Sequence, residues 1–182
     1  MTRGELLRLL IGSAGASAAA ASVARAELPA HRDAPGLEAR IDRLEAHQQI
    51  QTLMLDYGRT LDRRDFQAFA DLWATGAEYI QGAGPPAKGP AAIRAVLEAA
   101  FAQNAAGVSG PNFHVFFNQA IGPIEGDRAT AFSRSAFVAA GPAGGLEVVI
   151  AAHYDDIFVR ENGRWKFLRR VISADGTAPR RA

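Results

Sequence analysis

The second half of the chain holds four long strand-like segments joined by hairpin signals, and this pattern narrows the possible folds more than any other feature. The segments cover residues 113–124, 128–140, 146–160 and 164–173. The connections between them contain glycine together with asparagine, aspartate or proline, which are typical residues of tight turns. We therefore predict an antiparallel meander.

Helical periodicity precedes this meander. From Leu37 to about Leu61, apolar residues recur at steps close to the helical period with charged residues between them. This pattern predicts a long amphipathic helix. Asp65 is a suitable N-cap for a second, short helix that extends to Trp73.

A third helix is predicted to begin at Pro90 and to extend through Phe101, after a strand over residues 77–81 and a loop over residues 82–89. Helices followed by an antiparallel meander make an α+β domain. The chain has 182 residues, of which 48% are hydrophobic and 21% charged, so it is long enough for one such domain with a real core.

Residues 1–26 have the features of an export signal. Arg3 and Arg8 form a basic start, an apolar and alanine-rich run covers residues 9–23, and residues 24–26 provide a small-x-small cleavage site. A membrane anchor is the alternative, but the run is short and rich in alanine for that purpose.

The export route stays open between two systems. The first eight residues also resemble a twin-arginine signal, with Gly4 in the place of the second arginine, and the general secretory route fits as well. On either route we expect a mature protein that begins at about Glu27, lies in the periplasm or outside the cell, and has no stable association with a membrane. Residues 27–36 are expected to form a flexible leader.

The charge balance argues against nucleic acid as a partner. The net charge is +1, and removing residues 1–26 takes away three arginines and one glutamate, which changes it to −1. Binding to nucleic acid needs a basic patch. The chain has no cysteine, which excludes disulfides, thiol catalysis and zinc–thiolate sites. Its four histidines (His31, His47, His114 and His153) lack metal-ligand spacing, so we expect no metal site.

Two polar residues lie at unexpected places in these patterns. Asp62 ends the long helical segment, and His114 interrupts the apolar run of residues 113–117. A carboxylate that orients an imidazole is the minimum apparatus for taking a proton near neutral pH. Each residue also has a simpler explanation: a strand histidine that bonds a backbone carbonyl, and a carboxylate that pairs with Arg63 or Arg64.

Taken together, the motifs of the chain resemble the SnoaL-like branch of the NTF2-like superfamily. The matching segments are Tyr57 and Asp62 followed by residues 63–66, then residues 72–73, 77–79, 89–93, His114, residues 126–131, Tyr154 and residues 160–167. The resemblance implies an NTF2-like cone, an α+β barrel in which three N-terminal helices pack in a curved, mostly antiparallel sheet around a deep apolar pocket. It assigns residues 37–176 to this domain and leaves residues 177–182 as a tail.

The resemblance also implies roles for single residues. In the matching branch, an aspartate at the end of the first helix and a histidine in the strand after the third helix are catalytic, and these correspond to Asp62 and His114. Tyr57 corresponds to a hydroxyl donor, and Arg170 to a cation that stabilises a developing anion or leaving group. Some dehydratases of the family add an acidic or a second basic residue in the strand that here contains residues 133–137, where this chain has no acid.

The remaining wall of the pocket follows from strand alternation. Ile150, Ala152 and Tyr154 share one face, and His153 lies on the opposite one. Each predicted wall residue could instead serve only to pack the core. An aromatic lining suits an aromatic or alicyclic ligand. The predicted substrate-binding residues are Trp73, Tyr79, Phe101, Phe116, Asn118, Ser135, Phe137, Ile150 and Tyr154.

Two functions from different classes stay open, because the family is functionally mixed. The first is a cofactor-independent lyase in which a His–Asp dyad removes a proton and water, halide or formaldehyde leaves, or in which the substrate is isomerised. The second is a non-catalytic periplasmic binding module for a small apolar ligand, which the missing acid in residues 133–137 favours. The two differ in whether Asp62 and His114 meet at the cavity. Since sheets of this family often dimerise, we also expect a homodimer or homotrimer, and an interaction subunit is a third, weaker possibility.

Overall fold

The computed structural model describes residues 36–104, 110–141 and 143–177. These residues belong to one compact unit, Pro35–Ala182. The predicted export signal and nearly all of the predicted leader lie outside the described residues, as do residues 178–182 of the tail, so these assignments stay predictions. In the described part of the chain, no helix is long and apolar enough to cross a membrane.

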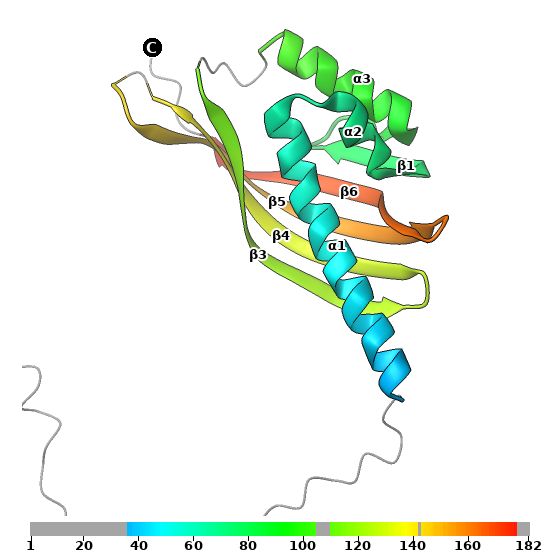
Figure 1. Cartoon of the computed structure of the whole chain (residues 1–182). Coiled ribbons are helices and arrows are strands. Elements are labelled where there is room, and N and C mark those ends of the chain that lie inside the picture. Colours follow the sequence, from blue (N-terminus) through cyan, green and yellow to red (C-terminus); the bar gives the residue numbers. More distant parts are fainter. Residues whose placement is uncertain (1–35, 105–109, 142, 178–182) are drawn as a thin grey trace, which may run out of the picture. The chain divides into compact units, whose positions relative to one another are not determined.

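The described residues form three helices and one six-stranded sheet (Figure 1). The sheet has the order β2-β1-β6-β5-β4-β3, and every neighbouring pair is antiparallel except β1 and β6, which are parallel. The elements are α1 (Leu37–Arg63), α2 (Phe66–Asp71), β1 (Trp73–Gln81), β2 (Ala87–Lys88), α3 (Gly89–Ala102), β3 (Asn112–Glu125), β4 (Arg128–Ala140), β5 (Leu146–Glu161) and β6 (Arg164–Thr177).

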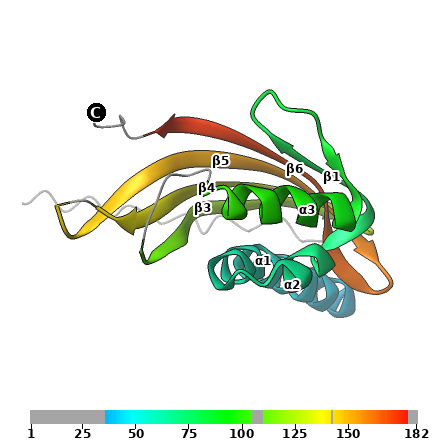
Figure 2. The ribbon, with the colours of Figure 1, turned by 90° about the horizontal axis from the view of Figure 1, so that it is seen from above.

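All three helices lie on the concave side of the sheet (Figure 2). α1 packs against β3 and β6, while α3 packs on β1 and α2. The core between the layers is rich in aromatic residues, including the wholly buried Phe69, Phe158 and Phe167. The predicted α+β cone is confirmed, with a sheet that curves but does not close, since β2 and β3 remain its edges.

The bounds of several elements differ from the sequence prediction. β6 runs to Thr177, past the predicted end at residue 173, so the first residue of the predicted tail belongs to the sheet. β1 begins at Trp73 rather than at residue 77, and Trp73 pairs with Phe167 of β6 instead of ending the second helix. A register shift between Trp73 and Glu78 interrupts this pairing, and the irregularity hides the start of the strand from a periodicity argument. β2 lies inside the predicted loop, and its two residues are too few to produce an alternating pattern.

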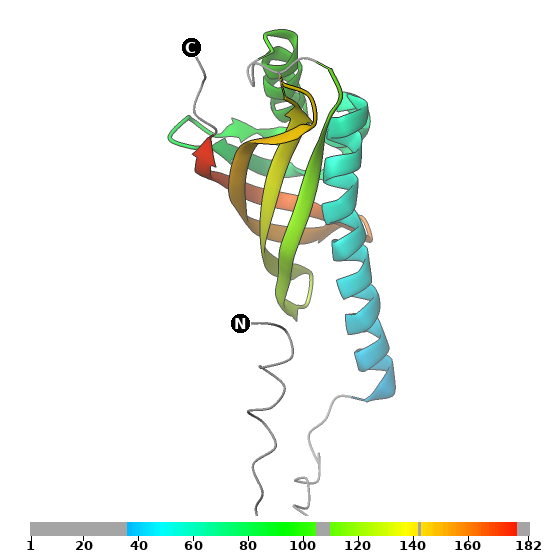
Figure 3. The same cartoon turned by 90° about the vertical axis from the view of Figure 1, so that its left-hand side faces the viewer.

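The first turns of α1 do not pack as the amphipathic pattern predicts. Leu37, Ile41 and Leu44 are 71%, 46% and 71% exposed, whereas Ala46 and Ile50 are buried. Figure 3 shows the first turns of α1 running beyond the strands. The core-facing stripe therefore begins at Ala46, because periodicity predicts an apolar face but not how far the opposing sheet extends.

α1 ends in a Schellman motif. The backbone N–H of Arg64 donates to the carbonyl of Leu61, and the N–H of Asp65 donates to the carbonyl of Thr60, both at 3.0 Å. The Asp65 side chain then accepts the N–H of Ala68 at 3.0 Å and caps α2, as predicted. The chain thus turns sharply after the last helical turn and fixes the residues of that turn in place.

A glycine allows α1 to approach β3 closely. A Cβ atom at Gly58 would lie 2.6 Å from the Phe116 ring, which is well inside van der Waals contact. Because Gly58 has no side chain, the last turns of α1 rest directly on the first half of β3. This contact brings the end of the helix to the strand that carries His114.

Candidate active site

A cavity of about 630 Å³ lies between the helices and the concave face of the sheet. One part of its wall is apolar and is formed by Leu61, Phe66, Leu97, Ala100, Phe101, Phe137, Ile150, Ala152 and Ile172. The other part is polar and is formed by Tyr57, Arg64, Tyr79, Gln81, Asn104, Asn112, His114, Ser135 and Tyr154. Among the described residues, the lining contains no aspartate or glutamate.

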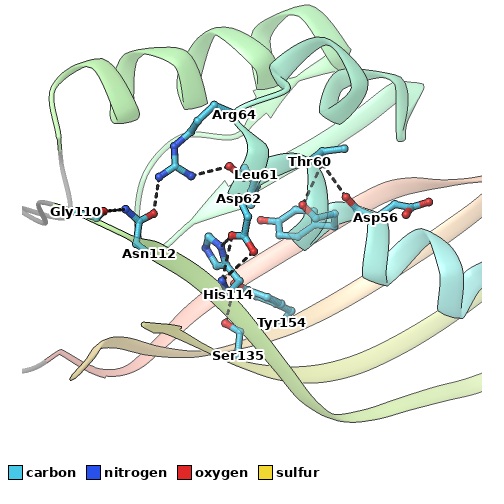
Figure 4. Close-up of polar contacts among 11 residues, drawn as sticks. Asp56, Thr60, Leu61, Asp62, Arg64, Gly110, Asn112, His114, Ser135 and Tyr154 are labelled. Carbon is cyan, nitrogen blue, oxygen red and sulfur yellow. Dashed lines mark hydrogen bonds and ion pairs between the residues drawn. The ribbon is translucent and has the colours of Figure 1, made fainter. Parts of the chain in front are cut away.

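Asp62 and His114 meet at the edge of this cavity (Figure 4). Asp62 Oδ1 lies 2.7 Å from His114 Nδ1, and the backbone N–H of His114 donates to both Asp62 carboxylate oxygens at 3.1 and 3.3 Å. An ionised carboxylate only accepts hydrogen bonds, so in the neutral imidazole Nδ1 carries the proton and Nε2 is left as the acceptor. The pair therefore has the tautomer that a general base requires.

The imidazole of His114 is held between aromatic rings. Its centroid lies 4.9 Å from that of Phe137 and 6.2 Å from that of Phe116. The side chain is 13% exposed and lines the cavity, while Asp62 contacts it from the α1 side without lining the cavity itself. The imidazole is thus held by contacts with two aromatic rings and by the hydrogen bond at Nδ1.

The three tyrosines of the chain all line the cavity. Ser135 donates to the Tyr154 hydroxyl at 2.8 Å, Gln81 Nε2 donates to the Tyr79 hydroxyl at 2.9 Å, and the hydroxyls of Tyr57 and Tyr79 lie 3.4 Å apart. The hydroxyls of Ser135, Tyr154, Tyr79 and Tyr57 carry four hydrogens in all. The Ser135–Tyr154 contact uses one of them and the Tyr57–Tyr79 contact uses another. Within the described part of the chain, two hydroxyl hydrogens therefore remain for a ligand.

Burial keeps these hydroxyls protonated. Desolvation is the largest cause that raises the pKa of Tyr57, Tyr79 and Tyr154 above the ordinary tyrosine value. The nearby charge of Arg170 acts in the opposite direction but does not outweigh burial. At working pH the three tyrosines therefore contribute neutral hydroxyls to the polar wall.

Arg170 lies behind the cavity wall rather than in it. It is wholly buried, and its Nε and Nη2 atoms each donate to a carboxylate oxygen of Asp156 at 2.7 Å. The guanidinium carbon is 3.9 Å from the ring centroid of Tyr57 and 4.5 Å from that of Tyr154. Desolvation opposes its charge, but Asp156 outweighs desolvation and raises the pKa of Arg170. The role that the resemblance implies for Arg170, direct contact with a developing anion or leaving group, does not fit this position. The sequence pattern also does not predict Asp156 as the partner of Arg170.

Three predicted substrate-binding residues do not line the cavity. Trp73 is buried in the core, where its ring centroid lies 5.0 Å from that of Phe167. Phe116 packs behind the wall, 5.7 Å from the Tyr154 ring centroid. Asn118 is exposed at φ 52°, within an irregularity of β3 that interrupts the alternation on which its prediction depended.

The other predicted residues lie at the cavity, and Tyr57 shares its wall although five residues separate it from Asp62. Tyr57 and Leu61, one turn apart, face the cavity, while Asp62 reaches β3 from the side. The predicted wall residues in the lining are Tyr79, Phe101, Ser135, Phe137, Ile150 and Tyr154. His153 lies on the opposite face, where its Nδ1 is 2.7 Å from Asp175 Oδ1.

Sequence reasoning missed Arg64, Gln81 and Asn112, which also line the cavity. Arg64 was considered only as an ion-pair partner of Asp62. Its direction depends on the left-handed turn after α1, which no periodic pattern predicts. Among the described residues, no group of three or more histidine, aspartate and glutamate side chains is arranged to hold a metal ion.

Comparisons with known proteins place this chain in a family. The model of the SnoaL-like domain matches residues 42–171. A comparison with curated protein sequences gave no match. Among solved structures, an NTF2-like protein with a cystatin-like fold from Novosphingobium aromaticivorans has a TM-score of 0.68 and 29% identity, covering 81% of this chain and 94% of that one.

Two further solved structures carry the names of enzymes. A hexachlorocyclohexane dehydrochlorinase, LinA type 2, has a TM-score of 0.65 and 22% identity over 77% of this chain and 92% of its own. A candidate scytalone dehydratase from Novosphingobium aromaticivorans has a TM-score of 0.64 and 21% identity over 79% of this chain and 93% of its own. At these identities the likeness establishes the fold, which is the NTF2-like cone.

Proposed function

The chain belongs to the SnoaL-like domain family, and we propose that it is a cofactor-independent lyase for a small hydrophobic substrate with an aromatic or alicyclic body. The observation that carries this proposal is the 2.7 Å contact between Asp62 and His114 at the edge of a largely apolar cavity. Dehydrochlorinase and dehydratase, the names of two structural neighbours, both denote eliminations and support this class of reaction.

In the proposed reaction, His114 Nε2 takes a proton from carbon, and the electron pair of that C–H bond forms a double bond as the leaving group departs from the adjacent carbon. The leaving group is a halide, or a hydroxyl that takes the proton from the His114 imidazolium and departs as water. In a retro-aldol variant, the base takes the proton of a hydroxymethyl group, the C–C bond breaks to release formaldehyde, and the carbon that keeps the electron pair takes the proton back from the His114 imidazolium. Isomerisation uses the same base without a leaving group.

Asp62 holds the imidazole in its reactive tautomer and stabilises the imidazolium that forms. It lies in the last turn of α1, where the negative end of the helix dipole also favours a cation. The free phenol hydrogens of the polar wall would stabilise negative charge that develops on a substrate oxygen. The buried guanidinium of Arg170 supports this role from behind the rings of Tyr57 and Tyr154.

A second candidate function is a periplasmic binding module that holds a small apolar ligand without transforming it. The observation that favours it is the lining without aspartate or glutamate, because such a wall offers no carboxylic acid to protonate a departing hydroxyl. The two candidates differ in whether His114 is needed for chemistry or only for packing.

The deciding experiment is a substrate screen with purified mature protein, read by mass spectrometry for loss of water, hydrogen halide or formaldehyde. The compounds are aromatic and alicyclic molecules with an acidic C–H next to a leaving group. We expect turnover that falls by about a hundredfold or more in His114→Gln and in Asp62→Asn. His153→Gln is the matched control, since His153 also bonds an aspartate at 2.7 Å but lies outside the cavity. Equal ligand binding in all variants without turnover would support the binding module instead.

A further inference from the structure

Arg64 is the one arginine or lysine in the lining of the described cavity. It extends from the end of α1 toward Asn112 at the start of β3, beside the Asp62–His114 pair (Figure 4). Its guanidinium donates to the Leu61 carbonyl and to Asn112 Oδ1, and its central carbon lies 4.0 Å from the ring centroid of Phe101. These contacts hold a cation at one end of a cavity whose other described lining residues are uncharged apolar and polar side chains and His114.

The charge of Arg64 is not neutralised by any carboxylate in the described part of the chain. The two hydrogen bonds that it donates go to a carbonyl and an amide oxygen, and its ring contact is with a hydrocarbon. A guanidinium has five N–H donors, so about three remain. Among the described residues the lining lacks aspartate and glutamate, and the Asp62 carboxylate beside the cavity is hydrogen-bonded to His114 rather than to Arg64.

The backbone at Arg64 is an independent sign that its side chain has a purpose. The residue has φ 59° in the left-handed region, at the Schellman position where glycine is the usual residue. A side chain at such a position is strained, and strained residues gather at binding and catalytic sites. The chain thus keeps an arginine where its backbone geometry favours glycine.

The position of Arg64 relative to His114 sets the distance between a bound anion and the base. Asn112, which accepts a hydrogen bond from Arg64, and His114, which bonds Asp62, are alternate residues of β3 and share one face. Alternate strand residues are about 7 Å apart. An anion at the guanidinium and a reacting C–H bond at the imidazole can therefore belong to one small molecule.

We infer that Arg64 binds the anionic group of the substrate, which makes the substrate a hydrophobic carboxylic acid. Its aromatic or alicyclic body occupies the apolar wall, its carboxylate bonds the free N–H groups of Arg64, and its reacting carbon faces His114. The placement of the reacting carbon at His114 rests on the proposed lyase function. Binding of the carboxylate by Arg64 does not require turnover. A purely structural role, in which Arg64 only ties α1 to β3 and α3, predicts no preference for charge.

The test is a calorimetric comparison of two probes with the same bicyclic body, 2-naphthoate and the neutral 2-naphthamide. We expect the wild-type protein to prefer the naphthoate by about tenfold or more, as hydrogen bonds to a charged group imply. Arg64→Gln abolishes this preference and leaves the Kd for naphthamide within about twofold. The matched control is Arg63→Gln, which removes the same charge from the neighbouring exposed residue and keeps the preference.

Three results would overturn the inference: equal binding of the two probes by the wild-type protein, equal weakening of both probes in Arg64→Gln, or loss of the preference in Arg63→Gln. Arg64→Lys, which keeps the charge, provides a second variant if Arg64→Gln does not fold, and it should retain part of the preference. Failure of the lyase proposal is recognised separately, since it appears as absent turnover with the charge preference intact.

Discussion

At the scale of single residues, the position of Asp62 determines what His114 can do. The carboxylate accepts both the ring Nδ1–H and the backbone N–H of His114, so it fixes the imidazole in place and in tautomer. Within the described part of the chain, the same cavity is lined by phenol hydroxyls and not by carboxylates. A base and a set of neutral donors therefore line one cavity together with apolar side chains, which is an arrangement suited to removing a proton from carbon.

The raised pKa values of the tyrosines make a prediction about alkaline pH. Burial raises the pKa of Tyr57, Tyr79 and Tyr154, so the folded protein keeps phenol protons that the unfolded chain loses above about pH 10. This contribution to stability is complete below that pH and is lost as the pH rises further. Since these are the only tyrosines of the chain, an ultraviolet titration reports on them alone. We expect tyrosinate to appear only together with unfolding, and a tyrosinate step in the folded protein near pH 10 would contradict the proposed burial.

At the scale of elements, the site depends on how α1 meets β3. We predict that Gly58→Ala destabilises the protein, because the new methyl group would lie 2.6 Å from the Phe116 ring. The gain in helix propensity, about 1 kcal/mol, should be outweighed by overpacking of about 1–3 kcal/mol. Urea unfolding measures the difference. Gly76→Ala serves as the control because its Cβ would have no neighbour within 4 Å, and an unchanged stability of Gly58→Ala would contradict the close contact.

The pairing of β5 with β6 depends on a buried ion pair. Replacing Arg170 by methionine leaves the Asp156 carboxylate buried without its partner, and we expect the free energy of unfolding to fall by about 3–5 kcal/mol. The double replacement Arg170→Met/Asp156→Leu should recover much of this loss, since it removes both charges. Arg169→Met is the control on the opposite face, where the side chain is 44% exposed. A double variant no more stable than the single one would show that the pair itself is not the cause.

The elements were largely predictable from the sequence because their signals are local. Hairpin turns follow from glycine next to asparagine, aspartate or proline, and the cap of α2 follows from Asp65. The site was predictable only in part. Asp62 and His114 are 52 residues apart, and their meeting followed from the family resemblance rather than from periodicity. Arg64 and Asp156 were missed because a left-handed turn and a pairing between strands decide where they point, and neither leaves a pattern in the sequence.

At the scale of the whole molecule, we propose that the outer face of the edge strand β3 is an interface between copies of the protein. Phe113, Val115 and Phe117 are 37%, 41% and 42% exposed, while the alternate residues His114 and Phe116 face inward. Three exposed apolar side chains in a row on an edge strand are typical of an interface. The homodimer or homotrimer expected from the sequence would bury this face.

We predict that Val115→Lys shifts the protein to a monomer in sedimentation velocity experiments, because a charge in the buried face opposes association. The dyad should be unaffected, since Val115 points away from the cavity that His114 lines. Lys88→Glu, on the opposite edge strand, is the control for changes in charge. A wild-type protein that is monomeric at micromolar concentration would contradict the prediction.

The central claim is that His114 acts as a base toward a molecule in the cavity, and the Kemp elimination tests it most directly. In 5-nitrobenzisoxazole the base takes the proton on carbon, the N–O bond breaks, and a coloured nitrile-bearing phenolate forms, so that no particular natural substrate is required. We predict that the wild-type protein and His153→Gln catalyse this reaction at similar rates, and that His114→Gln is slower by about a hundredfold. Equal rates in wild type and His114→Gln would contradict the claim and leave the cavity as a binding site without a catalytic base.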